Sequence, residues 1–400
     1  MCIRDRYVIT EVDPATEEET LERCASGESI GRTLYGDMTV PLYTTEDDEA
    51  VFLTRDEKGQ PFYNGHTTAD FMVRIPCSLI EEPKPAPILQ YGHGLLGSYG
   101  EARTGYLSDL ADREGYVIVA TDWKGMSDKD RGHITLMVAN DTSDFAFLPE
   151  RSLQGFVEFM AVLDVAMKGL PNDELLTFGG VNIVDPERRY YYGNSQGGIL
   201  GGAYLALSKQ LDRGVLGVGG APYSILLPRS ADFQPFFDLM TAKFTNAHDI
   251  ELVMALMQQV WDPAEAGGWL KDMNEAPAEG MMPKQVLLQV AIGDAQVTTL
   301  GAHVMARAYG AKTLAPQTRP IWGIEEVAES HSGSVIVEWE YPDGATEPFE
   351  NLPPDYALDT HECPRREAAA QEQMVRFFES GIIEQTCEGR CVGQRTGLCD

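Results

Sequence analysis

A serine between two glycines, in the pattern Gly-x-Ser-x-Gly at Gly193–Gly197, constrains the fold of this chain more than any other feature. The pattern follows a strand-like run, Arg189–Tyr192, and opens a helix-like run, Gln196–Leu207. A serine on a sharp turn between a strand and a helix has strained backbone angles, so small residues are needed two positions before and after it. Three further glycines let the helix lie close to a sheet: Gly198, Gly201 and Gly202. The alternative is an idle serine in a glycine-rich turn. That alternative does not require the flanking strand and helix, so we interpret Ser195 as a nucleophile.

A second glycine-rich loop follows an early strand. Ala86–Tyr91 reads as a buried strand and runs into Gly92–Gly97, whose sequence is Gly-His-Gly-Leu-Leu-Gly. Backbone N–H groups fixed in such a loop stabilise the oxyanion of a tetrahedral intermediate, each lowering the barrier by about 3 kcal/mol. We assign the two donors to the amides of Leu95 and Gln196. His93 precedes the serine in the chain, whereas the base of such a site follows it, so we interpret His93 as a residue that structures the loop.

A carboxylate and a histidine follow the serine at the positions expected for its partners. The apolar run Val286–Ile292 predicts a late strand, and Asp294 comes soon after its end. His361 lies in the segment Asp359–Glu362, just before an amphipathic helix expected over Arg365–Ser380. We predict that His361 is the general base and that Asp294 accepts its imidazole N–H, in the chain order serine, acid, histidine.

Other histidines and carboxylates compete for these roles. His303 falls in a helix-like stretch, which favours a packed or surface residue. His331 precedes the strand-like run Val335–Trp339, so it lies one strand too early. Asp355 and Asp359 are alternative acids, although both lie too close to the predicted base in sequence to face its ring easily. Chain order therefore favours His361 as the base and Asp294 as its acid.

These motifs together resemble the α/β-hydrolase superfamily, in its esterase and lipase branch. The matching segments lie between about residues 84 and 382: Gly92–Leu95, Gly193–Gly197, Gly293–Asp294 and Asp359–His361. The resemblance implies a serine hydrolase that cleaves carboxylic esters through a Ser-His-Asp triad and an acyl-enzyme intermediate, without a cofactor. The chain lacks a His-Gly-Gly-Gly run, which argues against the branch that uses that loop.

Strand-like and helix-like segments alternate over most of the chain, which predicts an α/β fold with a mostly parallel central sheet flanked by helices. The expected α/β-hydrolase core comprises residues 36–221 and 284–382. Residues 222–283 interrupt the alternation with a helix-rich apolar stretch, which we interpret as a cap over the active site. Residues 1–35 form an acidic N-terminal segment, of which residues 7–35 are expected to be loosely ordered, and residues 383–400 form a cysteine-rich tail.

Several elements of the core are predicted individually. Early antiparallel strands are expected at Met38–Tyr43, Val51–Leu53 and Asp70–Pro76, with a turn at Asp56–Gly59. Further elements follow at Ala102–Arg113 (helix), Tyr116–Thr121 (strand), Glu150–Lys168 (helix) and Val215–Gly220 (strand). Large apolar side chains give candidates for a substrate pocket: Trp123, Phe233, Phe236 and Met240. Packing within the cap is the simpler role for most apolar cap residues, and it fits Trp123 equally well.

The chain carries a large excess of negative charge, with 62 acidic and 31 basic residues and a net charge of −31. So acidic a surface repels DNA, RNA and anionic membranes, which argues against nucleic-acid partners. It suits solubility in high salt, where screening reduces self-repulsion. We therefore expect a saline source. A mildly acid-adapted extracellular enzyme is the alternative. A thermal stability that does not increase with salt concentration would contradict a saline source. No run of about 18 uncharged apolar residues occurs, so no membrane span is expected.

The first six residues, Met1–Arg6, match the translation of a common sequencing adapter. We therefore expect the natural chain to continue upstream of about Tyr7 and a signal peptide to have been lost. Six cysteines remain when Cys2 is set aside: Cys24, Cys77, Cys363, Cys387, Cys391 and Cys399. Their even number, with three clustered near the end, predicts disulfides and a secreted or periplasmic protein. A metal site at Cys387 and Cys391 is one alternative, and reduced thiols in the cytosol are another.

The expected substrate is a small-molecule or polymeric ester: a lipid, a polyester, an aryl ester or an acetylated glycan. Hydrolysis of amides or peptides by the same residues is one alternative, and a binding module without turnover is another. Metal and cofactor sites are not expected, since the sequence has no His-Glu-x-x-His motif, Walker loop or calcium loop. The loop at Gly92–Gly97 also lacks the third glycine and downstream acid of a dinucleotide site.

Overall fold

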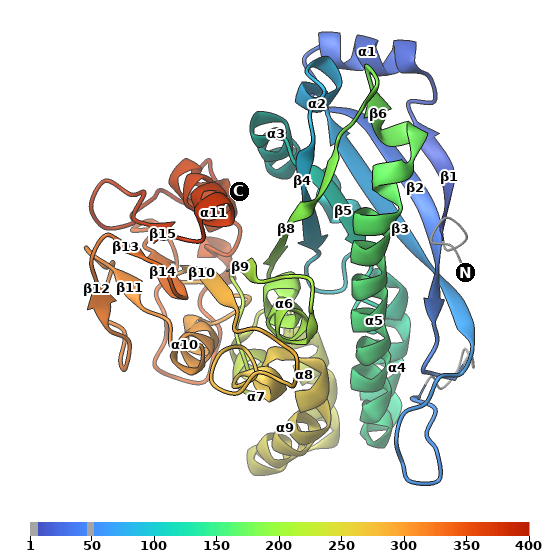
Figure 1. Cartoon of the computed structure of the whole chain (residues 1–400). Coiled ribbons are helices and arrows are strands. Elements are labelled where there is room, and N and C mark those ends of the chain that lie inside the picture. The colour runs from blue at the N-terminus through green and yellow to red at the C-terminus, as the bar shows by residue number, and fades with distance from the viewer. Residues whose placement is uncertain (1–6, 46–51, 400) are drawn as a thin grey trace. The chain divides into compact units, whose positions relative to one another are not determined.

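Strands and helices alternate along the chain in the structure, a computed structural model that describes residues 7–45 and 52–399 (Figure 1). They form two compact units. The first contains Met1–Asp130 and Glu150–Tyr191, and the second contains Arg131–Pro149 and Tyr192–Asp400. The adapter-like residues 1–6 and the predicted strand residue Val51 lie outside the described residues.

The first unit contains a mixed sheet with the strand order β1-β2-β3-β5-β4-β8. Its strands are β1 (Tyr7–Asp13), β2 (Ile30–Pro41), β3 (His66–Pro76), β4 (Ala86–Gly92), β5 (Val117–Thr121) and β8 (Val184–Asn194), with a small hairpin of β6 (Thr177–Phe178) and β7 (Val181–Asn182). Strand β2 pairs antiparallel with both β1 and β3, and β3 pairs antiparallel with β5, whereas β5 and β4 pair in parallel. Its helices are α1 (Glu17–Ala25), α2 (Cys77–Glu81), α3 (Gly105–Glu114) and most of α5 (Phe147–Lys168). Strands β4 and β5 are buried along their whole length and form the core of this unit.

Two of the three early strands are confirmed. The predicted segments Met38–Tyr43 and Asp70–Pro76 fall on β2 and β3. The predicted turn is present, with the amide of Gly59 donating to the carbonyl oxygen of Asp56 at 2.9 Å. Leu53 makes only an isolated bridge to Thr44, so the strand predicted around it is wrong in the part that the structure describes.

Residues 7–35 contain regular secondary structure, so the expectation of loose order is wrong. Strand β1 pairs antiparallel with β2, placing Val12 opposite Leu34. Thr16 begins α1 with a reciprocal capping box, in which its side chain and that of Glu19 each accept the other residue's backbone N–H. A disulfide joins Cys24 at the end of α1 to Cys77. Most polar residues of β1 and α1 are exposed, which is why the composition did not reveal a segment that sheet pairing and a disulfide hold in place.

The second unit contains the strand order β8-β9-β10-β14, and only the last three residues of β8 belong to it. Its main strands are β9 (Arg213–Gly217), β10 (Gln285–Ala291) and β14 (Val335–Trp339), and short strands occur at β11 (Thr313–Leu314), β12 (Glu326–Val327), β13 (Ser330–His331) and β15 (Ile383–Glu384). Strand β10 pairs in parallel with both neighbours, so Gln289 lies opposite Gly217 and Val337. Helices α10 (Thr299–Ala308) and α11 (Ala368–Ser380) pack against β10, on opposite sides of it in Figure 1.

Helix α6 (Gln196–Leu207) has the bounds that the sequence predicts and packs closely on β9. A Cβ atom on Gly198 would lie 2.7 Å from the carbonyl oxygen of Gly217, so only glycine permits this approach. Gly202 was expected to serve the same purpose. Its added Cβ would instead lie 2.7 Å from the Cβ of Ala266 and from the hydroxyl of Tyr309, so it allows contact with a loop and not with the sheet.

The stretch predicted as a cap, residues 222–283, is inserted between β9 and β10. It contains α7 (Tyr223–Leu226), α8 (Gln234–Lys243) and α9 (Ala247–Trp261), followed by 3-10 turns at Asp262–Ala264 and Ala266–Trp269. Helix α4 (Arg131–Asn140) of the same unit packs against α8. Within residues 7–45 and 52–399, no helix combines the length and apolar character needed to span a membrane.

The six cysteines other than Cys2 form three disulfides: Cys24–Cys77, Cys363–Cys399 and Cys387–Cys391. The prediction of disulfides is therefore supported, and the pairing, which the sequence could not choose, is resolved. The alternative of a metal site at Cys387 and Cys391 is wrong, because the two sulfur atoms are bonded to each other.

Candidate active site

Ser195 occupies the turn between β8 and α6. Its backbone angles, φ 59° and ψ −121°, lie outside the regions that residues with a side chain normally adopt. Such a conformation costs roughly 1–3 kcal/mol and persists where the surroundings enforce it. Two hydrogen bonds do so here: the amide of Ser195 donates to Gly217 on β9, and the amide of Ile199 donates to the carbonyl oxygen of Ser195, both at 2.9 Å. The turn therefore holds the serine at the carboxyl end of β8.

Asp294 and His361 come together from two loops of the second unit. Nδ1 of His361 and Oδ2 of Asp294 are 2.7 Å apart, and both side chains are buried. The other carboxylate oxygen, Oδ1, accepts the amides of Gln296 and Val297 at 2.8 Å each. Burial raises the pKa of Asp294, and the imidazole of His361 and the amide of Val297 oppose that shift. The carboxylate binds the N–H at Nδ1 of His361, which leaves Nε2 as the basic nitrogen.

Ser195 and Asp294 lie at the same edge of the parallel strands. Ser195 follows the carboxyl end of β8, Asp294 follows that of β10, and β9 lies between these two strands. The second unit therefore contains all three predicted catalytic residues, with the acid and the histidine in contact. Contact between the serine hydroxyl and Nε2 of His361 stays a prediction.

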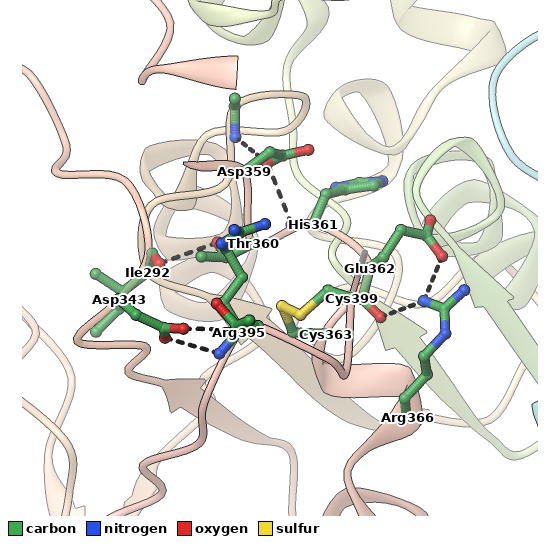
Figure 2. The surroundings of a disulfide bond; sticks show 12 residues. Ile292, Asp343, Asp359, Thr360, His361, Glu362, Cys363, Arg366, Arg395 and Cys399 are labelled. Carbon is green, nitrogen blue, oxygen red and sulfur yellow. Dashed lines mark hydrogen bonds and ion pairs between the residues drawn. A yellow bond between two sulfur atoms is a disulfide. The ribbon is translucent and has the colours of Figure 1, made fainter. Parts of the chain in front are cut away.

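The two residues before His361 fasten its loop to the loop after β10 (Figure 2). The carboxylate of Asp359 accepts the amide of Ala295 at 2.7 Å and that of His361 at 3.2 Å. The hydroxyl of Thr360 donates to the carbonyl oxygen of Ile292 at 3.0 Å. Asp359, an alternative acid in the sequence, thus binds the backbone of the histidine, whereas Asp294 binds its ring. Sequence reasoning missed this role because it looked only for carboxylates that face the ring.

A disulfide holds the same loop from the other side. Cys363 follows His361 by two residues and is bonded to Cys399 in the tail, as Figure 2 shows. The tail is held in addition by Asp343, whose carboxylate accepts the amides of Arg395 at 2.7 Å and Thr396 at 2.9 Å. These amide hydrogen bonds lower the pKa of Asp343 to about 2. The loop of the predicted base is therefore cross-linked to a tail that is itself anchored.

Replacing Cys363 and Cys399 by serine should lower the free energy of unfolding by about 4 kcal/mol, because the bond closes a loop of 36 residues. Removing Cys387–Cys391, whose separation is 4 residues, should cost only about 2 kcal/mol and is the matched control. Denaturant unfolding of both double variants measures the difference. Equal losses would contradict the chain-entropy argument, and six free thiols in the unreduced protein would refute the disulfides.

The charged groups around His361 set its protonation. Burial alone lowers the pKa of His361, but the charge and hydrogen bond of Asp294 outweigh burial and raise the pKa above its ordinary value. Arg365 opposes this shift, and Asp359 adds to it. Asp232, at the start of the predicted cap, also interacts with the imidazole, and burial raises the pKa of Asp232 itself. The base is thus surrounded mainly by carboxyl groups, which favour its protonated form.

Asp359→Asn should shift the acidic limb of the kcat/KM profile to lower pH. Removing a negative charge lowers the pKa of His361, so the neutral imidazole that accepts a proton persists further into acid. Asparagine keeps an oxygen for the amide of Ala295, so most of the rate at pH 8 should remain. Asp355→Asn, an exposed change in the same segment, is the control and should leave the profile in place. A profile measured from pH 5 to 9 decides, and an unmoved limb in Asp359→Asn would contradict the assignment.

The predicted oxyanion loop lies in the first unit. Nε2 of His93 accepts the amide of Trp123 at 2.7 Å, so Nδ1 carries the proton and donates to the carbonyl oxygen of Gly94 at 2.8 Å. Both nitrogens of His93 are used, in keeping with its interpretation as a structuring residue. Glu101, which the sequence analysis did not single out, accepts the amide of Gly94 at 2.8 Å and so braces the loop. The role of Leu95 as a donor stays a prediction.

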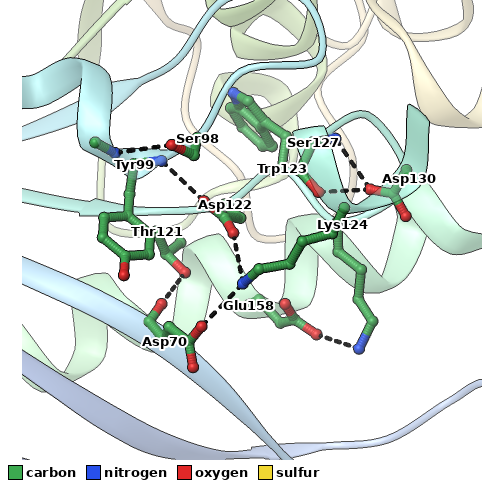
Figure 3. Close-up of polar contacts among 12 residues, drawn as sticks. Asp70, Ser98, Tyr99, Thr121, Asp122, Trp123, Lys124, Ser127, Asp130 and Glu158 are labelled. Atoms are coloured by element: carbon green, nitrogen blue, oxygen red, sulfur yellow. Dashed lines mark hydrogen bonds and ion pairs between the residues drawn. The ribbon is translucent and has the colours of Figure 1, made fainter. Parts of the chain in front are cut away.

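Trp123 is fully buried in the first unit, among the contacts drawn in Figure 3. Its ring stacks on Phe159 with centroids 3.3 Å apart and meets Phe156 edge-on. The next residue, Lys124, forms an ion pair with Glu158 at 3.0 Å. These contacts account for Trp123 as a packing residue, and its place in a substrate pocket stays a prediction.

The helices of the insertion line a cavity that is open on one side. Phe233 stacks on Phe236 with ring centroids 5.9 Å apart, and Met240 is buried. The cavity has a volume of about 550 Å³ and is lined largely by apolar residues of α8, α9 and their surroundings: Pro228, Phe237, Phe244, Ile250 and Met254. Phe233, Phe236 and Met240, which were predicted to line a substrate pocket, lie close in sequence to residues that line this cavity but do not line it themselves.

The competing histidines have other surroundings. Nε2 of His303 lies 2.8 Å from Oε1 of Glu338, which also binds Arg319 at 2.8 Å. His331 belongs to β13, which precedes the first residue of β14. It therefore lies toward the amino ends of the parallel strands, away from the edge where Asp294 emerges.

The central strands, the strained serine turn and the acid–histidine pair are arranged as in the α/β-hydrolase fold, and the predicted fold class is confirmed. No family model and no curated protein sequence matches the chain. Similar solved structures include the acylaminoacyl peptidase of Pyrococcus horikoshii, with 12% identity, a TM-score of 0.46, and coverage of 87% of this chain and 42% of that one. The chain thus spans less than half of the length of this peptidase.

Two esterases are similar over most of their own length. Acetyl xylan esterase 1 from a Thermoanaerobacterium species is 15% identical, with a TM-score of 0.42 and coverage of 83% of this chain and 87% of that one. An esterase of Pyrobaculum calidifontis is 15% identical, with a TM-score of 0.42 and coverage of 91% of this chain and 90% of that one. The substrate of each of these esterases belongs to that enzyme and is not carried over to this chain.

Proposed function

We propose that the protein is a serine hydrolase of carboxylic esters, in which Ser195 is the nucleophile, His361 the base and Asp294 its partner. The observation that supports this most is the 2.7 Å hydrogen bond between Nδ1 of His361 and Oδ2 of Asp294, in a buried site. The strained turn at Ser195, at the same edge of the strands, supports it further. This combination orients and activates a serine nucleophile.

In the acylation step, Oγ of Ser195 attacks the ester carbonyl carbon while Nε2 of His361 takes the hydroxyl proton. The amides of Leu95 and Gln196 stabilise the oxyanion of the tetrahedral intermediate. Asp294 holds the imidazole in the correct tautomer and stabilises its charged form. The intermediate collapses, the C–O bond to the alcohol breaks, and the imidazolium returns its proton to the leaving alcohol.

Deacylation repeats the sequence with water. His361 removes a proton from water, the resulting hydroxide adds to the acyl carbon, and the new tetrahedral intermediate expels Ser195. The serine oxygen recovers its proton from His361, and the carboxylic acid departs. The net reaction consumes one water molecule and needs no redox partner.

The proposed substrate is an ester with an apolar acyl or aryl part, free or carried on a polymer, because the insertion contains a largely apolar cavity. The cavity of about 550 Å³ lies in the size range of small-ligand sites, and its lining is mostly apolar. Glu251 is part of this lining and Asp232 lies near the base, so the local charge disfavours anionic esters.

A secreted or periplasmic location fits the cysteine chemistry. Three disulfides, one of them beside the proposed base, persist in oxidising compartments and are rare in the cytosol. Reduction would remove the cross-link between the loop of His361 and the tail.

A panel of p-nitrophenyl esters of rising acyl length, beside a p-nitroanilide, tests the proposed reaction. Ester turnover that exceeds anilide turnover, and that Ser195→Ala removes, would support an esterase. The reverse preference would indicate an amide or peptide hydrolase. Failure of a fluorophosphonate probe to label Ser195, together with no turnover, would indicate a binding module and refute the proposal.

A further inference from the structure

Gln196, the residue after the proposed nucleophile, has a buried side chain that is fixed by one partner. Its Nε2 donates a hydrogen bond to the hydroxyl of Tyr223, the first residue of α7. Both residues are buried. A side chain fixed in this way restrains the backbone that carries it, and the backbone N–H of Gln196 is the proposed oxyanion donor.

The ring of Tyr223 is itself held in place. It stacks on Trp261, the last residue of α9, with ring centroids 4.0 Å apart and an angle of 21° between the planes. Phe145 packs edge-on against Trp261 with centroids 5.0 Å apart. The hydroxyl of Tyr223 therefore stands at the end of a packed aromatic group and cannot follow a displaced glutamine without disturbing that group.

Two polar side chains fix the backbone on which Tyr223 lies. Oε1 of Gln258 accepts the amide of Ser224 at 2.8 Å, and its Nε2 donates to Oε1 of Glu265 at 2.7 Å. Oε2 of Glu265 accepts the amide of Gly267 at 2.8 Å. The backbone N–H of Tyr223 also stabilises this carboxylate. The start of α7 is thus bound through a buried hydrogen-bond network.

The carboxyl group in this network is costly to bury. Burial raises the pKa of Glu265 to about 7, although the N–H donors oppose the shift. The titratable groups that face it are Asp262, Tyr223 and Tyr309, and Asp262 raises the pKa further. A carboxyl group buried beside another acid costs stability, and buried carboxyl groups with a raised pKa cluster at functional sites.

We propose that Tyr223 is a positioning residue for the oxyanion hole: its hydroxyl holds the side chain of Gln196 and thereby the amide that faces the oxyanion. Gln258 and Glu265 hold Tyr223 in turn. This inference rests on the proposed function, and it adds to that function a residue of the insertion that acts on the chemical step without touching the substrate.

The distinguishing consequence is a change in kcat without a matching change in KM. The oxyanion forms only in the transition state, so a displaced donor weakens transition-state binding and leaves ground-state binding alone. Tyr223→Phe keeps the ring on Trp261 and removes only the hydroxyl. We expect kcat to fall by about 10- to 100-fold, less than the loss of a whole oxyanion donor, with KM within about twofold of wild type.

A double-mutant cycle with Gln196→Met tests the coupling on a p-nitrophenyl ester. Methionine has a similar length, keeps the backbone N–H and lacks the donor that binds Tyr223. If the two side chains act as one unit, the double variant should be hardly slower than either single variant. Tyr309→Phe is the matched control, because it removes the hydroxyl of another buried tyrosine that faces Glu265, and its kcat should stay near wild type.

Thermal unfolding of each variant shows whether it is folded, and Gln196→Met carries the test should Tyr223→Phe fail to fold. An unchanged kcat in both single variants would overturn the inference, as would additive losses or an equal loss in Tyr309→Phe. Wild-type protein without turnover that depends on Ser195 would refute the proposed function and this inference with it. Turnover in wild type that survives Tyr223→Phe unchanged would refute the inference alone.

Discussion

Replacing Ser195 by alanine should lower kcat by about 10⁴-fold or more while the protein remains folded. Alanine keeps the Cβ atom at a backbone conformation that already accommodates one, so the strained turn and its bond to Gly217 should persist. The hydroxyl itself adds little to packing. Initial rates on a p-nitrophenyl ester, with thermal unfolding as a check on the fold, measure the effect.

Ser208→Ala provides a matched control for this change. Ser208 ends the same helix, is also buried, and accepts the amide of Gln210 through its hydroxyl. Its kcat should stay within about twofold of wild type, as is usual for a change remote from the reacting atoms. A Ser195→Ala enzyme that kept a tenth of the wild-type rate would place the nucleophile elsewhere.

His361→Ala should be nearly as damaging as loss of the serine, because His361 supplies the proposed basic nitrogen and its ring is held by the buried carboxylate of Asp294. Residues that act as one unit fail together, so adding Ser195→Ala should slow His361→Ala hardly further. His303→Ala and His331→Ala should have mild effects on kcat. Steady-state kinetics of all four variants decide the assignment.

A severe loss in His331→Ala would contradict the placement of the base and shift it by one strand. A severe loss in His303→Ala needs a separate check, because this residue binds the buried Glu338 in a partly exposed ionic cluster with Arg319. Thermal unfolding distinguishes the two causes. A destabilised His303→Ala with normal kcat at low temperature would leave the catalytic assignment intact.

The sequence predicted best where one pattern had one physical solution. Helix α6 and strand β14 have the predicted bounds, because glycine spacing after Ser195 and the run Val335–Trp339 each allow one secondary structure. The sequence predicted the fold least well where polar residues form a strand at the edge of the sheet. Strand β1 alternates weakly, and its pairing with β2 is a long-range contact that no local pattern reveals. The cysteine pairs were open for the same reason.

The candidate site was likewise predictable in one part and not in the other. Chain order and position after a strand sufficed to bring Asp294 and His361 together. The supporting residues could not be predicted, since their roles depend on contacts between distant segments. Asp359 reads as a rival acid until its bond to the amide of Ala295 is known, and Tyr223 reads as an ordinary aromatic residue until its hydroxyl meets Gln196.

The loop of His361 is fastened on both sides, by Asp359 and Thr360 before the histidine and by the disulfide of Cys363 after it. Removal of the imidazole should therefore leave the backbone where it is, with an opening the size of one ring and the carboxylate of Asp294 at its base. Free imidazole has the shape and the nitrogen atoms to enter that opening. The His361→Ala protein would then be a host for a diffusible base, whose rate rises and saturates with added imidazole. If free imidazole restores the activity of His361→Ala, the geometry of the active site is set by the fastened loop and not by the histidine side chain.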